Sequence, residues 1–125
     1  MLLDSRDNLA QLHTALQTFL ASSSLELLLP AEQSGDPAPY EAFLPGIRVR
    51  KTSGPIVLRR LADGWLDLAG STEHLLRYAS FFWFPPGEDS GHHHPEHSRV
   101  PGYMSPSSMS LIIEADSTWP GHGAV

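Results

Sequence analysis

The chain has 125 residues, of which 41% are hydrophobic and 18% charged, and its formal net charge at pH 7 is −6 with histidine neutral. This length predicts a single domain, residues 1–125, and this composition excludes a disordered polar chain. The excess of acidic residues argues against nucleic acid as a partner, since phosphate binding requires clustered Lys and Arg. No cysteine is present, which excludes disulfides and thiolate catalysis.

The start of the sequence lacks the form of a signal peptide, because Asp4, Arg6 and Asp7 interrupt its apolar residues. No segment approaches the ~18 to 20 apolar residues of a membrane span. We therefore expect a cytoplasmic protein that does not bind membranes.

Two amphipathic helices are predicted. Leu and Phe recur at spacings of three and four over residues 5–22, and the buried face there includes Leu12, Leu16 and Phe19. A second helix follows Ser71, a residue type that caps helix N-termini. Its predicted buried face consists of Leu75, Leu76, Ala79 and Phe82.

Short apolar or alternating segments predict the strands. The first of them ends at Pro30 and is apolar throughout, so we expect it to be a buried strand. The next three are separated by short turns and predict two consecutive hairpins. The predicted strands are 25–29, 47–50, 55–61, 65–69 and 110–115. Together these elements predict an α+β fold with two helices packed on one face of a mostly antiparallel sheet of about five strands.

Segments rich in Pro, Gly and Ser separate these elements. Residues 30–46 hold four prolines and two glycines, and residues 85–108 combine Pro, Gly and Ser with four of the seven histidines. We expect long ordered loops at 30–46 and 85–108, and a loose tail from residue 117. Loops of this size in a small domain are often functional.

The turn of the second hairpin decides which face of the sheet is apolar. A three-residue loop that ends at Gly64, with Gly64 in the left-handed conformation, places Leu58 opposite Leu68 and Arg59 opposite Asp67. A two-residue loop would mix charged and apolar side chains on both faces, so we expect the longer loop. One face then holds Ile47, Val49, Ile56, Leu58, Leu66 and Leu68. The other face holds Arg48, Arg50, Arg59, Trp65 and Asp67.

This second face is a candidate binding surface, because its arginines outnumber its acids and an acidic partner could neutralise the surplus. Aromatic residues also gather at the end of the second helix, where Phe81 and Trp83 flank the buried stripe. They need cover from residues 85–108 or from another molecule. The predicted partner-binding residues are Arg48, Arg50, Arg59, Trp65, Phe81 and Trp83.

No catalytic site is evident. The sequence has no nucleophile elbow, phosphate-binding loop or dinucleotide fingerprint, so we expect no cofactor and favour a protein that is not an enzyme. The alternative is a metal-dependent enzyme or small-ligand-binding protein with His92, His94 and His97 as metal ligands. In an extended segment His92 and His94 share one face, but Pro95 prevents a helix that would align more ligands. We therefore expect residues 92–97 to form a polar loop near Trp83.

Residues 64–116 resemble the immunity protein 32 family of bacterial polymorphic toxin systems. The resemblance rests on the Gly70-Ser71 turn, the Leu-rich helix that follows it, the segment His92-His93-His94 and the closing strand Leu111-Ile112-Ile113-Glu114. It implies a small cytosolic antidote that binds a toxin domain and blocks it without chemistry of its own. We expect a protein partner, a toxin domain on this resemblance.

Overall fold

The computed structural model describes residues 2–4, 6–30, 45–84, 90–93 and 102–116. In chain order the elements are β1 (Leu2–Asp4), α1 (Arg6–Leu20), β2 (Glu26–Pro30), β3 (Gly46–Lys51), β4 (Val57–Arg60), β5 (Leu66–Gly70), α2 (Thr72–Ala79), the short 3₁₀ helix η1 (Ser80–Phe82), β6 (Ser90–His93) and β7 (Ile113–Asp116). No helix among these residues is long and apolar enough to cross a membrane.

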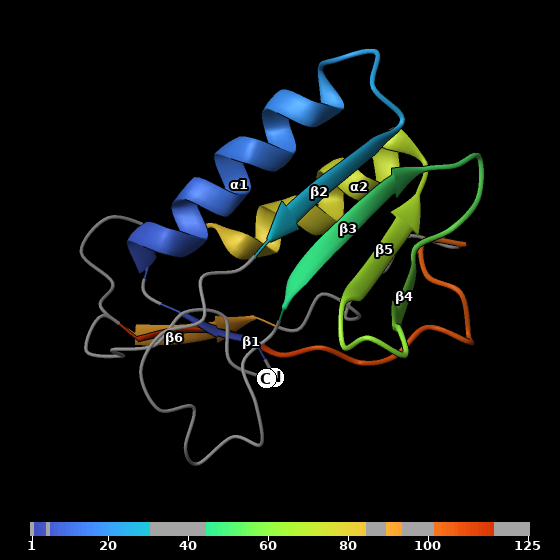
Figure 1. The fold of residues 1–125 in the computed structure, drawn as a ribbon. Coiled ribbons are helices and arrows are strands. Elements are labelled where there is room, and N and C mark those ends of the chain that lie inside the picture. Colours follow the sequence, from blue (N-terminus) through green and yellow to red (C-terminus); the bar gives the residue numbers. More distant parts are fainter. Residues whose placement is uncertain (1, 5, 31–44, 85–89, 94–101, 117–125) are drawn as a thin grey trace.

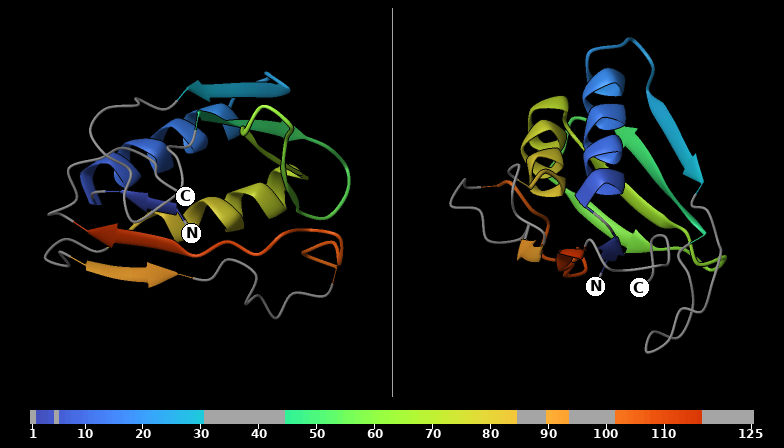
Figure 2. Two further views of the ribbon diagram at one scale, coloured as in Figure 1. Left: turned by 60° about the horizontal axis from the view of Figure 1, so that its bottom comes forward. Right: turned by 90° about the vertical axis from the view of Figure 1, so that its left-hand side faces the viewer.

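The predicted α+β architecture is confirmed. The main sheet has the strand order β2-β3-β5-β4, and both helices cover one of its faces (Figures 1 and 2). It has four strands rather than five and is mixed, because β3 and β5 run parallel while the outer pairs are antiparallel.

The first predicted hairpin is wrong, since β3 pairs with β5 and not with β4. Every residue of β5 is buried, which suits a central strand, whereas Arg59 and Arg60 of β4 are exposed, as expected at an edge.

A second, three-stranded sheet has the order β1-β7-β6, with β1 and β7 parallel and β6 and β7 antiparallel. The predicted loop at 85–108 is therefore wrong for Ser90–His93, which form β6 by pairing with β7. Its sequence has few residues typical of strands, so only the distant partner β7 defines it. The rest of that loop up to residue 101, residues 31–44 and the tail from 117 lie outside the described residues.

The predicted core of α1 is largely confirmed: Leu16 and Phe19 are buried, Leu12 is half-buried, and Leu9 joins them. In α2 the burial of Leu76 is wrong, because its side chain is 52% exposed. Tyr78 takes its place.

The buried face of α2 and η1 consists of Leu75, Tyr78, Ala79 and Phe82, which follow helical spacings of three and four. The predicted cap of this helix is confirmed, since the Ser71 hydroxyl accepts a hydrogen bond from the backbone N–H of His74 at 3.2 Å.

The predicted register of the second hairpin is confirmed. Leu58 lies opposite Leu68 and Arg59 opposite Asp67. The backbone N–H of Leu61 donates to the carbonyl of Trp65, and Gly64 has a φ of +91° in the loop between them. The face toward the helices is apolar and buried, as expected, and holds Ile47, Val49, Ile56, Leu58, Leu66 and Leu68.

The edges of the main sheet differ. The outer edge of β4 is covered by residues 103–109, where Ile56 donates to the Tyr103 carbonyl at 2.7 Å and Met109 donates to the Leu58 carbonyl at 2.9 Å. Strand β2 is an edge strand, so its predicted burial is wrong: Leu28 is 56% exposed, and no described strand pairs with its outer edge.

Substitutions on α2 and η1 test which face is buried. Phe82→Ala should lower the free energy of unfolding by about 3 to 5 kcal/mol, because Phe82 is 2% exposed and its removal leaves a cavity. Leu76→Ala should lower it by less than about 1 kcal/mol, since its side chain is largely in solvent. Urea unfolding of both variants measures the difference, and equal losses would contradict this assignment.

Candidate binding surface

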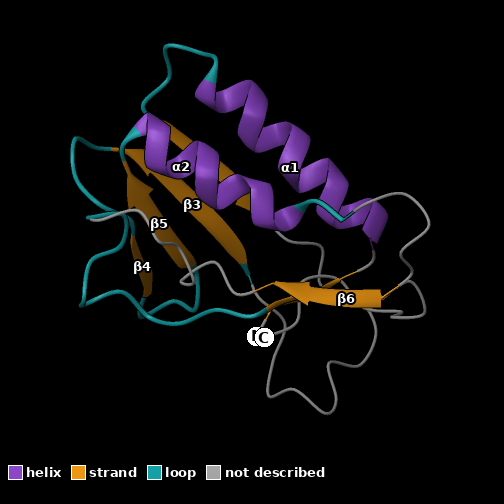
Figure 3. Ribbon diagram, turned by 180° about the vertical axis from the view of Figure 1, so that it is seen from behind, coloured by secondary structure: helices purple, strands orange, loops and turns teal. Residues whose placement is uncertain are grey.

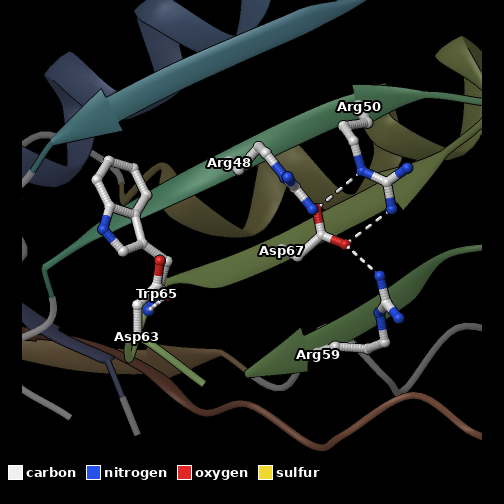
Figure 4. A network of polar contacts seen from close by, with 6 residues as sticks. All are labelled: Arg48, Arg50, Arg59, Asp63, Trp65 and Asp67. Carbon is white, nitrogen blue, oxygen red and sulfur yellow. Dashed lines mark hydrogen bonds and ion pairs between the residues drawn. The ribbon is translucent and has the colours of Figure 1, made fainter. Parts of the chain in front are cut away.

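A buried carboxylate lies at the centre of the outer face of the main sheet, the face turned away from the helices. Asp67 of β5 is wholly buried, and three guanidinium groups surround it (Figure 4). Arg48 Nε donates to its Oδ1 at 3.0 Å, and Arg59 Nη2 donates to its Oδ2 at 2.9 Å. Arg50 binds both oxygens, through Nε at 2.9 Å and Nη2 at 2.8 Å. We call Arg48, Arg50 and Arg59 the arginine cluster.

Strand pairing places these residues together. Asp67 is paired with Arg48 of β3 on one side and with Arg59 of β4 on the other. Arg50 follows Arg48 by two residues, so it projects from the same face of β3. The three arginines therefore reach one carboxylate from both neighbouring strands.

The electrostatics explain why the acid tolerates burial. Desolvation alone would raise the pKa of Asp67, but the hydrogen bonds from Arg50, Arg48 and Arg59 outweigh it and hold this pKa well below its ordinary range. The hydrogen bond to Asp67 in turn raises the pKa of Arg50. A buried carboxylate without such partners would be strongly destabilising, so at least part of the cluster is a structural requirement.

The cluster nevertheless exceeds what one carboxylate requires. The side chains of Arg48, Arg50 and Arg59 are 31%, 34% and 54% exposed, so they remain accessible above the buried Asp67. Glu26 of β2 lies opposite Arg50 and is the other acid that the four paired strands place on this face. Among the residues of these strands, one positive charge therefore remains in excess on this face.

Apolar side chains flank the cluster. Trp65 lies beside Arg48 on the same face (Figure 4). Its ring covers Gly46, where an added Cβ would come within 2.5 Å of the indole, so only glycine allows this position. Leu28 of β2 lies opposite Arg48 and is more than half exposed. Leu28 is not among the predicted binding residues, although a leucine run just before a proline is compatible with an edge strand.

The other two predicted binding residues lie elsewhere. Phe81 and Trp83 follow α2, which packs on the opposite face of the main sheet (Figure 3). Phe81 is half-buried against the ring of His93, whereas Trp83 is 44% exposed. The six predicted partner-binding residues therefore form two separate groups, and four of them surround Asp67.

Residues 92–97 begin in strand β6, so the predicted polar loop is wrong for His92 and His93. His93 donates from Nδ1 to the Phe81 carbonyl at 2.7 Å and stacks on the Phe84 ring at 4.3 Å. The side chain of His92, and all of His94 and His97, lie outside the described residues. Within the described residues no group of three His, Cys, Asp or Glu could hold a metal ion. The metal alternative stays a prediction from sequence.

Comparison with family models, with curated proteins and with solved structures gave no match to this chain. The resemblance to the immunity protein 32 family therefore stays a hypothesis that rests on the motifs alone.

Replacement of the buried acid tests its role. Asp67→Asn keeps the shape but removes the carboxylate that the three guanidinium groups share, so the free energy of unfolding should fall by about 3 to 5 kcal/mol at pH 7. Because the pKa of Asp67 is lowered by folding, its stabilisation is fully present above its unfolded pKa of about 4 and is lost as the pH falls toward the lowered value. The difference in stability between wild type and Asp67→Asn should therefore shrink below about pH 4. Thermal melts across this range measure it, and a difference that is independent of pH would contradict the assignment.

Proposed function

We propose that this chain is a non-catalytic binding protein, of the immunity type that its sequence resembles, and that it binds an acidic surface of a protein partner through the outer face of the main sheet. On that resemblance the partner is a toxin domain. One observation carries the proposal: three partly exposed arginines converge on a single buried carboxylate and leave positive charge at the surface.

The arginine cluster is already ordered before any partner arrives. Its hydrogen bonds to Asp67 restrict the guanidinium groups, so less side-chain entropy is lost on binding than for free arginines. Arg and Trp are also the residue types that contribute most strongly to protein interfaces. The cluster with Trp65 has this composition.

The charge distribution supports an acidic partner. The chain as a whole carries a formal charge of −6, whereas the centre of this face is positive. A local patch of this kind steers an acidic partner toward one face and disfavours approach to the rest of the molecule.

Arg59 and Arg60 provide a matched test, because both are exposed, both lie on β4 and only Arg59 binds Asp67. The partner to test is the protein encoded beside this chain. Arg59→Gln should weaken its binding at least about tenfold, equal to about 1.4 kcal/mol, while Arg60→Gln should leave binding within about twofold. Isothermal titration calorimetry measures both. When co-expressed with that protein, the wild-type chain and Arg60→Gln should rescue cell growth better than Arg59→Gln does.

Equal effects of the two substitutions would contradict the assignment of this face. An absence of any binding by the wild-type chain would contradict the proposed function for that partner.

A further inference from the structure

We propose that the arginine cluster receives a single carboxylate side chain, Asp or Glu, from the partner, and that Arg48 and Arg59 bind it while Arg50 holds the cluster in place. This inference rests on the proposed function and specifies the chemistry of its site.

The charges that the paired strands place on this face match one carboxylate. The three guanidinium groups carry three positive charges, Asp67 neutralises one and Glu26, opposite Arg50, offsets a second. The charge of Glu26 also helps to raise the pKa of Arg50 through space. One carboxylate would complete the balance, whereas a phosphate group with about −1.5 to −2 charges would exceed it.

The hydrogen-bond donors divide the arginines into two roles. A guanidinium has five N–H donors, arranged so that pairs of them can bind a carboxylate in a fork. Arg50 uses such a pair, Nε and Nη2, on Asp67. Arg48 uses only Nε, so both of its terminal nitrogens lack a bond to any described residue. Arg59 uses only Nη2. Arg48 and Arg59 each commit one nitrogen to Asp67, whereas Arg50 commits the Nε–Nη2 edge of its guanidinium and lies opposite Glu26. Arg48 and Arg59 therefore keep more donors for a second carboxylate than Arg50 does.

The neighbours of Arg48 predict what lies next to that carboxylate in the partner. Trp65 flanks Arg48 on one side, and Leu28 lies opposite it on β2. Both side chains present apolar surface beside the charged Arg48. This favours a partner segment in which the acidic residue is adjacent to an apolar residue. This arrangement combines a polar anchor with apolar contact.

Three short probes test the inference directly on the full chain: acetyl-Leu-Glu-amide, its neutral match acetyl-Leu-Gln-amide, and acetyl-Leu-phosphoserine-amide. NMR spectra of ¹⁵N-labelled protein at pH 7 and constant ionic strength follow the arginine Nε–H signals. The Glu probe should shift the signals of Arg48 and Arg59 saturably and more than that of Arg60. The Gln probe should bind at least fivefold more weakly. Arg59→Gln should weaken binding of the Glu probe at least fivefold, and Arg60→Gln should weaken it less than twofold.

Equal binding of the Glu and Gln probes, or no saturable shift, would overturn the inference. Tighter binding of the phosphoserine probe would assign the site to a phosphoryl group instead.

These outcomes are separable from failure of the proposed function. If the partner requires Arg59 but the Glu probe fails, the outer face is the interface and the single-carboxylate assignment is wrong. If the probe binds as expected but Arg59→Gln leaves partner binding unchanged, the site exists and the proposed function is wrong.

Discussion

The burial of one carboxylate in the central strand of the main sheet constrains the structure around it. Asp67 is wholly buried, so water cannot compensate its charge, and arginines from both neighbouring strands must do so. These contacts form only in the observed register of β3, β5 and β4. A slip by one residue would turn Arg59 toward the helices and expose Leu58, so the ion network and the apolar core enforce the same register.

The same network supports the binding role that we propose for the outer face. Asp67 restricts the guanidinium groups, but three of them are more than one carboxylate needs, and Arg48 and Arg59 keep donors that no described residue uses. In the proposed function, structural and binding roles fall on different arginines of one cluster. Arg50 binds both oxygens of Asp67, whereas Arg59, the most exposed of the three, makes a single hydrogen bond to it.

The features that sequence predicted correctly depend on local chemistry. The left-handed Gly64 and the alternation on either side of it determined the hairpin register, and Ser71 marked the start of α2. The errors concern distant partners: the parallel pairing of β3 with β5 and the pairing of β6 with β7 leave no signal in local periodicity. The central position of Asp67 was missed for a related reason. An acid within an apolar strand marks a buried ion pair, but only the sheet order shows that three arginines share it.

A direct measurement of the central claim is the side-chain carboxyl ¹³C titration of Asp67 by NMR. If three arginines surround an ionised, buried Asp67, its signal should remain that of a carboxylate at pH values where an ordinary Asp, with a pKa of about 3.9, is half protonated. A titration midpoint at or above that ordinary value would contradict the account, because it would mean that the arginines do not hold this carboxylate in its charged form.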